Sequence, residues 1–328
     1  MMRIETKPAA LRALKAERHR KVLPVPENFR DASYGIRADR RYSLSREVQV
    51  RGVASFENRP LTIRMRPVRG FMPTIGCRGL NLPLRSEHAV KGAHNIQLGE
   101  VKIIEHVLAM MTALNLDVDF LLSRPSFPTF DHCNRPFLEA ARGHFVDQGP
   151  AKLFTVRRPF GGIFDRGYFM LEPADGERTL VMDHQISYPG TAVGDQRIVA
   201  AITPEFFSYI CGARTTSFRP ETRRIYWLTR LGIARLKYPV TVHNILFADA
   251  HKLYNPRTWF DAGGINYEFI CHELMDVMAW IRFLEVQQNG KFVGRLTTFF
   301  FDHHRQVDAA RFVCEAPEFE RRIGLQFA

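Results

Sequence analysis

One stretch constrains the fold more than any other: residues 100–114, EVKIIEHVLAMMTAL. Val101, Ile104, Leu108 and Met111 follow one another at steps of three and four residues, which is the apolar stripe of a helix lying on a core. No Gly or Pro interrupts the stretch, so we expect one continuous helix over it.

Two polar residues, Glu105 and His106, lie inside this apolar stretch. A carboxylate and an imidazole beside a buried stripe need a partner, because burying them without one is costly. Adjacent side chains on a helix point about 100° apart, so the pair could flank one site from one helix edge. A surface Glu with a hydrogen-bonded core His is the simpler interpretation of this segment taken alone.

The composition indicates a folded protein outside the membrane. The 328 residues suffice for two ordinary domains, and 45% are hydrophobic while 24% are charged. No run of 18 apolar residues predicts a membrane span, and the basic N-terminus lacks the apolar segment of a secretory signal. The five cysteines are scattered and form no C-x-x-C, which argues against a disulfide framework or a Cys-rich zinc site. We therefore expect a cytoplasmic protein.

The net charge of +12 favours anionic partners. Much of the excess lies in the first 51 residues and in residues 223–235. We find no helix-turn-helix, zinc-finger or RNP signature, so no nucleic-acid partner is expected. A solvated basic surface and a peripheral contact with an anionic membrane are the alternatives for this charge. Nothing in the sequence indicates an oligomeric state.

Strand and helix patterns occur in both halves without regular βαβ alternation, which predicts two α+β domains, each a β-sheet packed on helices. Residues 1–40 are interpreted as a basic N-terminal extension, 41–149 as the first domain and 150–328 as the second. Gly149-Pro150 marks a plausible linker. The candidate site residues described below come from both halves, so we expect the active site at the interface between the two domains.

Four further segments predict helices from their periodicity and end signals. The predicted helices are Leu11 to Leu23, Phe137 to Val146, Glu268 to Val286 and Arg305 to Cys314. A fifth short helix is expected from Pro204 to Cys211.

The third of these segments contains metal-ligand spacing. His272 and Asp276 are at positions i and i+4, so on a helix they share one face about a turn apart. An imidazole nitrogen and a carboxylate oxygen suit zinc, and a third protein ligand would leave the fourth position open to water. A surface hydrogen bond is the commoner use of such a pair.

Another histidine pair, His303 and His304, follows an apolar β-rich run. A polar strand end is the simple interpretation. One of the two imidazoles could instead serve as a general acid, since its pKa lies near neutrality.

Taken together and in order, these motifs resemble the UDP-3-O-acyl-N-acetylglucosamine deacetylase (LpxC) family, the zinc enzymes of the committed step of lipid A synthesis. The matching segments are Ile104-Glu-His-Val107, Ala213-Arg-Thr-Thr216, His272-Glu-Leu-Met-Asp276 and Phe301-Asp-His303. The resemblance extends from about Glu47 to Val313.

The resemblance implies a zinc-dependent amidohydrolase, an N-deacetylase acting on an acylated sugar or sugar nucleotide. His106, His272 and Asp276 would bind the zinc ion, and Glu105 would be the general base that takes a proton from the attacking water. His303 would protonate the leaving amine, with His304 as the alternative acid. Thr215 would donate a hydrogen bond to the oxyanion.

The departures from the family pattern concern the substrate and the acid. Glu273 stands where the family has a Lys that holds the nucleotide end, and this charge reversal should repel a diphosphate. Trp280 stands where the family has a second carboxylate that orients the catalytic His, and Asp302 is the one nearby candidate to replace it. Phe130-Asp-His-Cys133 replaces a Met-Asp-Gly-Ser segment. These changes keep open a second hypothesis: a catalytically impaired or regulatory paralogue that retains the fold.

The family holds its acyl chain in a passage built from an insert of the second domain. Asp183 to Val193 is the corresponding segment here, with Tyr188 as a lining residue; an ordinary β-hairpin is the alternative. The acyl length is not encoded in any feature of the sequence.

Overall fold

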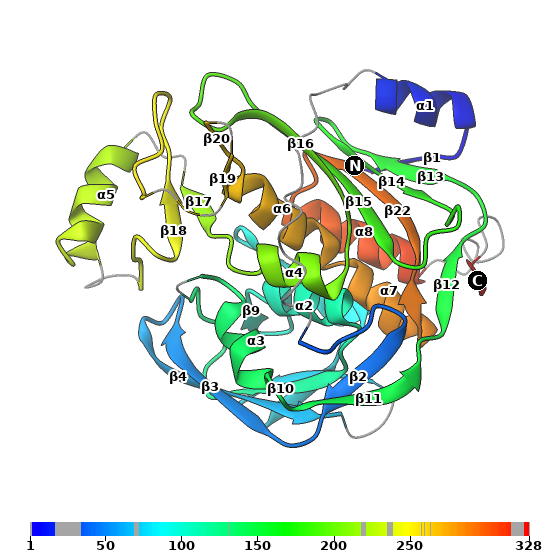
Figure 1. Cartoon of the computed structure of the whole chain (residues 1–328), viewed down its shortest axis with the longest axis horizontal. Helices are drawn as coiled ribbons and strands as arrows, with labels where there is room; N and C mark the ends of the chain where they lie inside the picture. The colour runs from blue at the N-terminus through cyan, green and yellow to red at the C-terminus, as the bar shows by residue number, and fades with distance from the viewer. Residues whose placement is uncertain are drawn as a thin grey trace.

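The computed structural model describes residues 2–16, 34–68, 72–130, 132–217, 221–234, 239–256, 258, 260–262, 264–315 and 325–327. Two large β-sheets enclose a layer of helices (Figure 1). The lower sheet in this view comes from the first half of the chain, and the upper sheet comes mainly from the second half. The predicted α+β class is confirmed. Across the described ranges, none of the helices combines the length and apolar character needed to cross a membrane.

The lower sheet has five strands in the order β3-β4-β10-β5-β6. Their bounds are Val48–Ala54, Arg59–Pro67, Val118–Leu122, Thr74–Cys77 and Leu80–Pro83, in that order. Along β4 the side chains of Leu61, Ile63 and Met65 are buried and alternate with more exposed residues. This is the period of two expected for a strand with one face on a core.

The upper sheet has six strands in the order β1-β13-β14-β22-β15-β16. Their bounds are Arg3–Glu5, Phe160–Ile163, Tyr168–Glu172, Gly294–Phe299, Leu180–Tyr188 and Gly194–Ala201, in that order. The neighbours are antiparallel except for β15 and β22, which run parallel.

Smaller sheets connect these layers. They comprise β2 (Arg40–Leu44) with β11 (Phe145–Pro150), β7 (Ala89–Gly92) with β8 (Asn95–Leu98) and β9 (Val101–Lys102), β12 (Leu153–Val156) with β21 (Lys291–Phe292) and β23 (Leu325–Phe327), β17 (Thr215–Ser217) with β18 (Ile245–Phe247), and β19 (Asp261–Ala262) with β20 (Ile265–Asn266).

The described helices are α1 (Pro8–Ala16), η1 (Ser86–His88), α2 (Glu105–Leu114), α3 (Arg135–Ala141), α4 (Pro204–Ile210), α5 (Thr222–Arg230), α6 (Glu268–Met278), α7 (Ile281–Gln288) and α8 (His303–Glu315). Helices α2, α4, α6, α7 and α8 form the layer between the two large sheets, whereas α5 lies at the periphery (Figure 1). The predicted helix from Pro204 to Cys211 is confirmed by α4.

Helix α2 lies at the centre of the molecule, and all ten of its residues are buried. The prediction of one helix over residues 100–114 is wrong at its start. Val101 and Lys102 pair with β8, and Ile103 has φ 62°, a left-handed conformation that ends any helix before it. The stripe is therefore shared between a strand and a helix. At the other end, Asn115 caps the helix with φ 48°.

The predicted helix from Glu268 to Val286 is two helices, α6 and α7, separated at Ala279 and Trp280. The break lies where Trp280 is fully buried against the rings of Phe169 and Phe301. Both Ala279 and Trp280 keep right-handed helical dihedrals, so the apolar periodicity continues across the break and does not reveal it. Earlier in the chain, the helix predicted from Phe137 to Val146 is the shorter α3, which begins at Arg135 and ends at Ala141.

Two strand pairings involve the predicted linker and the predicted N-terminal extension. Gly149 and Pro150 belong to β11, which pairs with β2, so the proposed linker is a paired strand. The first residues are part of the second half's sheet, since β1 pairs with β13. Residues 17–23 of the predicted N-terminal helix lie outside the described residues. The division of the chain into residues 1–40, 41–149 and 150–328 stays a prediction.

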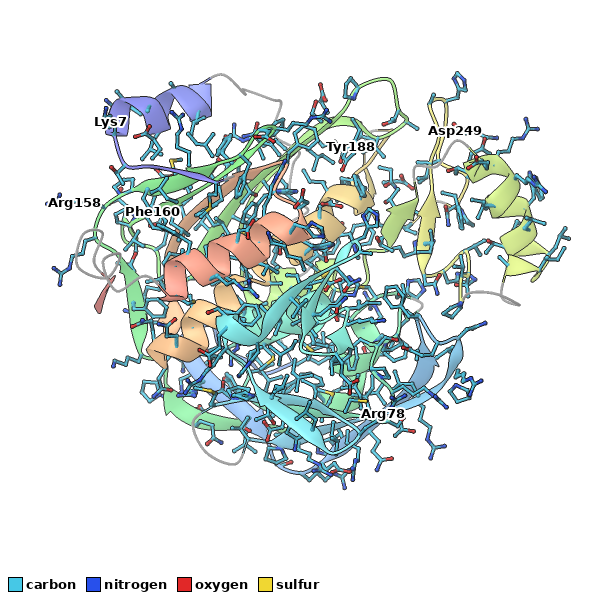
Figure 2. All side chains as sticks on the ribbon, turned by 180° about the vertical axis from the view of Figure 1, so that it is seen from behind. Lys7, Arg78, Arg158, Phe160, Tyr188 and Asp249 are labelled. Atoms are coloured by element: carbon cyan, nitrogen blue, oxygen red, sulfur yellow. The ribbon has the colours of Figure 1, made fainter. Side chains whose placement is uncertain are left out.

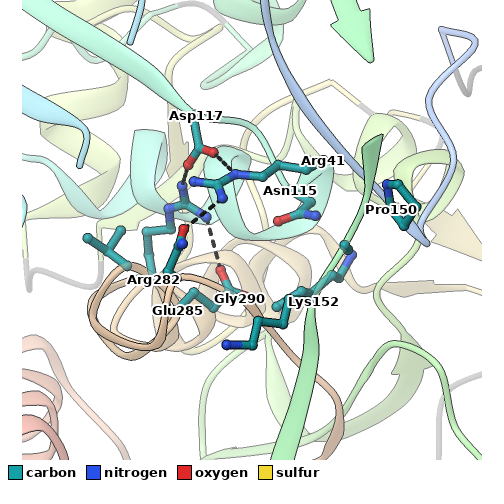
Figure 3. A pocket seen from close by; sticks show the side chains of 12 residues that line it. Arg41, Asn115, Asp117, Pro150, Lys152, Arg282, Glu285 and Gly290 are labelled. Carbon is teal, nitrogen blue, oxygen red and sulfur yellow. Dashed lines mark hydrogen bonds and ion pairs between the residues drawn. The ribbon is translucent and has the colours of Figure 1, made fainter. Parts of the chain in front are cut away.

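A buried ionic network ties the two halves together. Asp117 precedes β10 and accepts hydrogen bonds from Arg41 of β2 and Arg282 of α7 (Figure 3). Arg41 also donates to Asn289 at 2.7 Å, and Arg282 donates to Glu285 at 3.3 Å. Removing one member of a buried network is costly because it leaves the others unpaired.

The surface carries basic residues on several sides. Lys7, Arg78 and Arg158 are exposed; Lys7 and Arg158 lie toward one side of the molecule in Figure 2, and Arg78 lies at its lower edge.

Candidate metal centre

The site lies where helix α2 packs against helix α6. His106 comes from the first turn of α2, and His272 and Asp276 come from one face of α6. All three side chains are buried, with 9%, 1% and 4% of the residue exposed. The structure thus brings together residues from the two halves of the chain that the sequence predicts to meet.

The distances within this group match those between ligands of one ion. His106 Nε2 lies 3.4 Å from Asp276 Oδ1, and His272 Nε2 lies 3.4 Å from Asp276 Oδ2. Two nitrogen or oxygen ligands that are each about 2.0–2.1 Å from a tetrahedral zinc ion lie roughly 3.3–3.4 Å apart. Each imidazole therefore lies at a separation suited to sharing a zinc ion with one of the two Asp276 oxygens.

An unsatisfied oxygen gives the same indication. Asp276 Oδ1 is buried and makes no hydrogen bond to any residue that the structure describes. Buried carboxylate oxygens normally have a partner, because leaving one without a partner costs free energy. A cation held between Asp276 and the two imidazoles would supply it.

A hydrogen bond on the side of the His272 ring away from the site fixes its orientation. Its Nδ1 bonds to the carbonyl oxygen of Ala213 at 2.9 Å, and because a carbonyl only accepts, the ring must carry its proton on Nδ1. In the neutral ring Nε2 is then the nitrogen that has its lone pair facing the site, as in metal-ligating histidines. Arg214 anchors this segment through a bidentate ion pair with Glu268 of α6, at 2.7 and 2.8 Å. Thr215 follows directly and begins β17.

One residue at the site was not predicted from the sequence. Cys133 is buried, and its sulfur lies together with one ring nitrogen each of His106 and His272, all three atoms within 4.8 Å of one another. It precedes α3 in a tight loop, and the neighbouring Asn134 donates to the carbonyl of His106 at 2.7 Å. From the sequence alone, Cys133 is distinguished only as part of the Phe130-Asp-His-Cys133 segment.

The ionisation of the metal-free group is strongly coupled. Burial raises the pKa of Asp276, but the charges of His272, His106 and His303 outweigh burial and lower it. Burial lowers the pKa of His272, but Asp276 and Cys133 raise it to about 9. Burial raises the pKa of Cys133, whereas His106 and His272 lower it to about 6. At neutral pH the metal-free group therefore favours a carboxylate and a thiolate, which can bind a metal, together with protonated imidazoles, which must lose a proton to do so.

Glu105 occupies the first position of α2, beside His106. It is 2% exposed, and its Oε2 accepts a hydrogen bond from the backbone N–H of Ile96 at 2.9 Å. Burial raises the pKa of this carboxyl, and the charge of Asp276 raises it further. A carboxyl with a raised pKa is suited to accepting a proton near neutral pH.

The two candidate acids are separated by the structure. His303 begins α8, and its Nε2 lies 3.8 Å from Asp276 Oδ2. The ring of His304 instead bonds to the carbonyl of Gly92 at 2.7 Å. His303 therefore faces the site and His304 faces another segment.

Among the described residues, no carboxylate makes a hydrogen bond to Nδ1 of His303, the role that the family's second carboxylate would have. Asp302 caps α8, since its Oδ1 accepts from the N–H of Arg305 at 3.0 Å, and its side chain is 60% exposed. Trp280 lies in an aromatic cluster. His303 Nδ1 is buried without a hydrogen bond to any described residue. The geometry gives no replacement through Asp302.

The predicted substrate residues, Glu273 and Tyr188, lie beside the site. Glu273 is half-buried on α6 next to His272, and burial together with Asp276 raises its pKa to about 7. Tyr188 ends β15 and packs on the ring of Phe269 at 5.2 Å (Figure 2). Burial and the charge of Glu273 raise the pKa of Tyr188.

The segment from Asp183 to Val193, predicted as the acyl-chain insert, includes most of β15 and the turn into β16. These two strands form a regular antiparallel hairpin from Val181 to Ala201. The alternative of an ordinary hairpin describes this geometry.

A buried His-His-Asp group next to a buried glutamate, held between two α+β halves, is the arrangement of metal-dependent hydrolases. The sequence profile of one such family, UDP-3-O-acyl N-acetylglycosamine deacetylase, matches residues 41–306. Because the match covers most of the chain, this chain belongs to that family, and the resemblance predicted from the motifs is confirmed.

Individual relatives are distant. The chain is 26% identical over 196 residues to the UDP-3-O-acyl-N-acetylglucosamine deacetylase of Nitratidesulfovibrio vulgaris, covering 59% of each protein. It is 24% identical over 197 residues to that of Lawsonia intracellularis, covering 58% of this chain and 60% of the relative. With that of Helicobacter pylori it shares 21% over 263 residues, 77% of this chain and 85% of the relative. The first two matches thus span less than two thirds of the relatives' length.

Proposed function

We propose that this protein is a zinc-dependent amidohydrolase that removes an acyl group from the nitrogen of an N-acylated sugar, as part of lipid A synthesis. The observation that carries the proposal is the pair of 3.4 Å separations that join Asp276 to His106 and to His272. These distances fit three protein ligands of one tetrahedral ion. Family membership and the buried Glu105 next to His106 support the hydrolytic chemistry.

His106 Nε2, His272 Nε2 and Asp276 would hold the zinc ion. When bound, the ion would supply Lewis acidity, polarising the amide carbonyl of the substrate and acidifying water at the site. The Ala213 carbonyl would keep the His272 ring in the tautomer that leaves Nε2 available.

Glu105 would act as the general base. The Ile96 N–H holds Oε2, which leaves Oε1 to take the proton of the attacking water. His303 Nε2 would then protonate the leaving nitrogen, so that the product departs as a neutral amine. Thr215, two residues beyond Ala213, would donate its hydroxyl hydrogen to the oxyanion.

Glu273 and Tyr188 would contact the substrate. Since Glu273 replaces a lysine at the nucleotide-binding position, we propose either the family's usual sugar nucleotide, bound more weakly, or a related N-acylated sugar without a diphosphate. A cytoplasmic location and a peripheral contact with an anionic membrane are part of this proposal.

The test is to purify the full chain under reducing, chelator-free conditions and to measure both bound zinc and amine release. We expect close to one zinc per chain and release of amine from at least one member of a panel of N-acetylated sugars and sugar nucleotides. A protein without metal would contradict the hydrolase proposal.

A second function is favoured by one observation. His303 Nδ1 has no hydrogen bond to any residue of the described part, and the family's second carboxylate is replaced by the buried Trp280. An acid that is not oriented by a carboxylate would be less effective, so a regulatory or catalytically impaired paralogue is the alternative. Stoichiometric zinc without amine release from the whole panel would favour it.

A further inference from the structure

The loop before α3 holds its two central residues in an uncommon backbone conformation. His132 has φ 60° and Cys133 has φ 50°, both in the left-handed region, although neither is glycine. L-residues adopt this conformation at a cost in free energy, and they keep it where the surroundings impose it. Such outliers are concentrated at functional sites.

The surroundings of this loop do impose it. The Asn134 N–H donates to the carbonyl of Cys211 at 2.8 Å, and the Asn134 side chain donates to the carbonyl of His106 at 2.7 Å. On the other side, the His132 N–H donates to the carbonyl of His243 at 3.0 Å. The loop is therefore bound both to α2 and to segments of the second half, and its geometry places the Cys133 thiol at the junction.

The thiol lies close to the two proposed imidazole ligands. The sulfur of Cys133 and one ring nitrogen each of His106 and His272 lie within 4.8 Å of one another. The thiol is 6% exposed. Zinc binds a cysteine sulfur at about 2.3 Å and an imidazole nitrogen at about 2.0–2.1 Å, so sulfur and nitrogen ligands of one tetrahedral ion lie roughly 3.5 Å apart. A small movement of the side chain satisfies this geometry.

We propose that Cys133 is a fourth protein ligand of the metal, beside His106, His272 and Asp276. The inference rests on the metal centre of the proposed function and deepens it. On binding, a bond forms between the metal and the Cys133 sulfur as thiolate, and the protons held by the cysteine and histidine group are released to solvent.

This ligand changes the type of site. A zinc site with three protein ligands keeps an open position for water, whereas a site with four protein ligands is closed. With Cys133 bound, water and substrate must displace the thiolate before hydrolysis. Cys133 thus determines the resting state of the site, and replacing it should raise turnover several-fold.

Cobalt(II) gives a readout that does not depend on activity. The full-length protein is stripped of metal, reduced and titrated with Co²⁺, and metal content is measured in parallel. We expect one equivalent to bind with a near-ultraviolet thiolate-to-cobalt charge-transfer band. Cys133→Ser should bind cobalt without this band. Cys211→Ser is the matched control, because Cys211 is also buried and its thiol bonds to the Ser208 carbonyl, a bond that a hydroxyl can keep.

The outcomes separate this inference from the proposed function. One bound cobalt without the band, or a band that persists in Cys133→Ser, overturns the role of Cys133 and leaves the proposed hydrolase standing. The band without amine release contradicts the hydrolase and supports the ligand. A protein that binds no metal overturns both. Should Cys133→Ser not fold, zinc X-ray absorption of the unmodified protein decides: one sulfur neighbour at about 2.3 Å supports the inference, and none overturns it.

Discussion

His106 Nε2 lies 3.4 Å from Asp276 Oδ1 across the contact between α2 and α6, although the two residues come from opposite halves of the chain. The two groups approach closely, yet Oδ1 makes no hydrogen bond to any described residue. This relationship joins the fold to the chemistry, because the packing of two helices brings two ligands to the spacing that a tetrahedral ion requires.

Removal of either ligand should therefore remove the metal. We expect His106→Ala and Asp276→Ala to lose zinc on dialysis, with affinity lowered by more than the roughly 10- to 100-fold that is typical of losing a ligand's hydrogen-bond partner. Metal analysis of the dialysed proteins measures this. His304→Ala is the control and should retain zinc, because His304 bonds to Gly92 away from the site. Full zinc content in Asp276→Ala would refute the ligand assignment.

Glu105 should be needed for turnover and not for metal. Glu105→Gln keeps the size of the side chain and an oxygen to accept from Ile96 N–H, so the fold and the zinc content should be unchanged. Loss of a general base typically lowers the rate by about 10²- to 10⁴-fold. Amine release per bound zinc is the measurement. A variant with wild-type turnover would assign the base to another group.

Glu273 should control recognition of a diphosphate. Its carboxyl lies on α6 directly after His272, so reversing its charge changes the electrostatic potential near the substrate. We expect Glu273→Lys to gain activity on the sugar nucleotide, mainly through a lower KM, while Glu273→Gln gains less. Equal KM values for the three proteins would show that this position does not contact the nucleotide end.

The sequence predicted the local parts of this site better than their assembly. The i,i+4 spacing of His272 and Asp276 and the adjacent Glu105 and His106 are periodic features of single helices, and periodicity is a local property. The start of α2 was mispredicted because Val101 pairs with Leu98 across the two-residue turn Gly99-Glu100. This hairpin is local, but the apolar stripe continues through its second strand into the helix, so the stripe alone does not show where the helix begins.

Cys133 and Trp280 show the same limit. A single cysteine outside a C-x-x-C motif does not indicate a metal site. Its place at the site depends on a loop with left-handed backbone at His132 and Cys133, and no glycine in the sequence indicates that conformation. Trp280 falls within a helical pattern, and this pattern does not reveal that α6 and α7 are separate helices or that the ring packs against Phe169 and Phe301. At both positions the outcome depends on tertiary contacts.

Zinc affinity should increase with pH. In the metal-free protein the pKa of His272 is about 9, above its ordinary value of 6.5, mainly because Asp276 and Cys133 outweigh the effect of burial. The imidazole is thus protonated at neutral pH and must lose this proton to bind zinc. Affinity should rise at least about tenfold per pH unit up to about pH 9 and then level off, because one proton or more is released per ion. Competition with a chelator measures it, and an affinity independent of pH would contradict the shifted pKa.

Trp280 should be a structural residue, although it stands where the family has its second carboxylate. It is fully buried and packs edge-on against two rings, with ring centroids 5.4 Å apart for Phe169 and 6.1 Å apart for Phe301. Trp280→Ala should lower the free energy of unfolding by about 3–5 kcal/mol, the usual range for truncating a large buried aromatic side chain, and Trp280→Phe should cost less. Chemical denaturation of the zinc-loaded proteins measures both. Trp280→Asp should fold worst, because it adds an unpaired carboxylate to an aromatic cluster. If Trp280→Asp instead folded and raised turnover, the carboxylate would reach His303 and the tryptophan would be the cause of impaired catalysis.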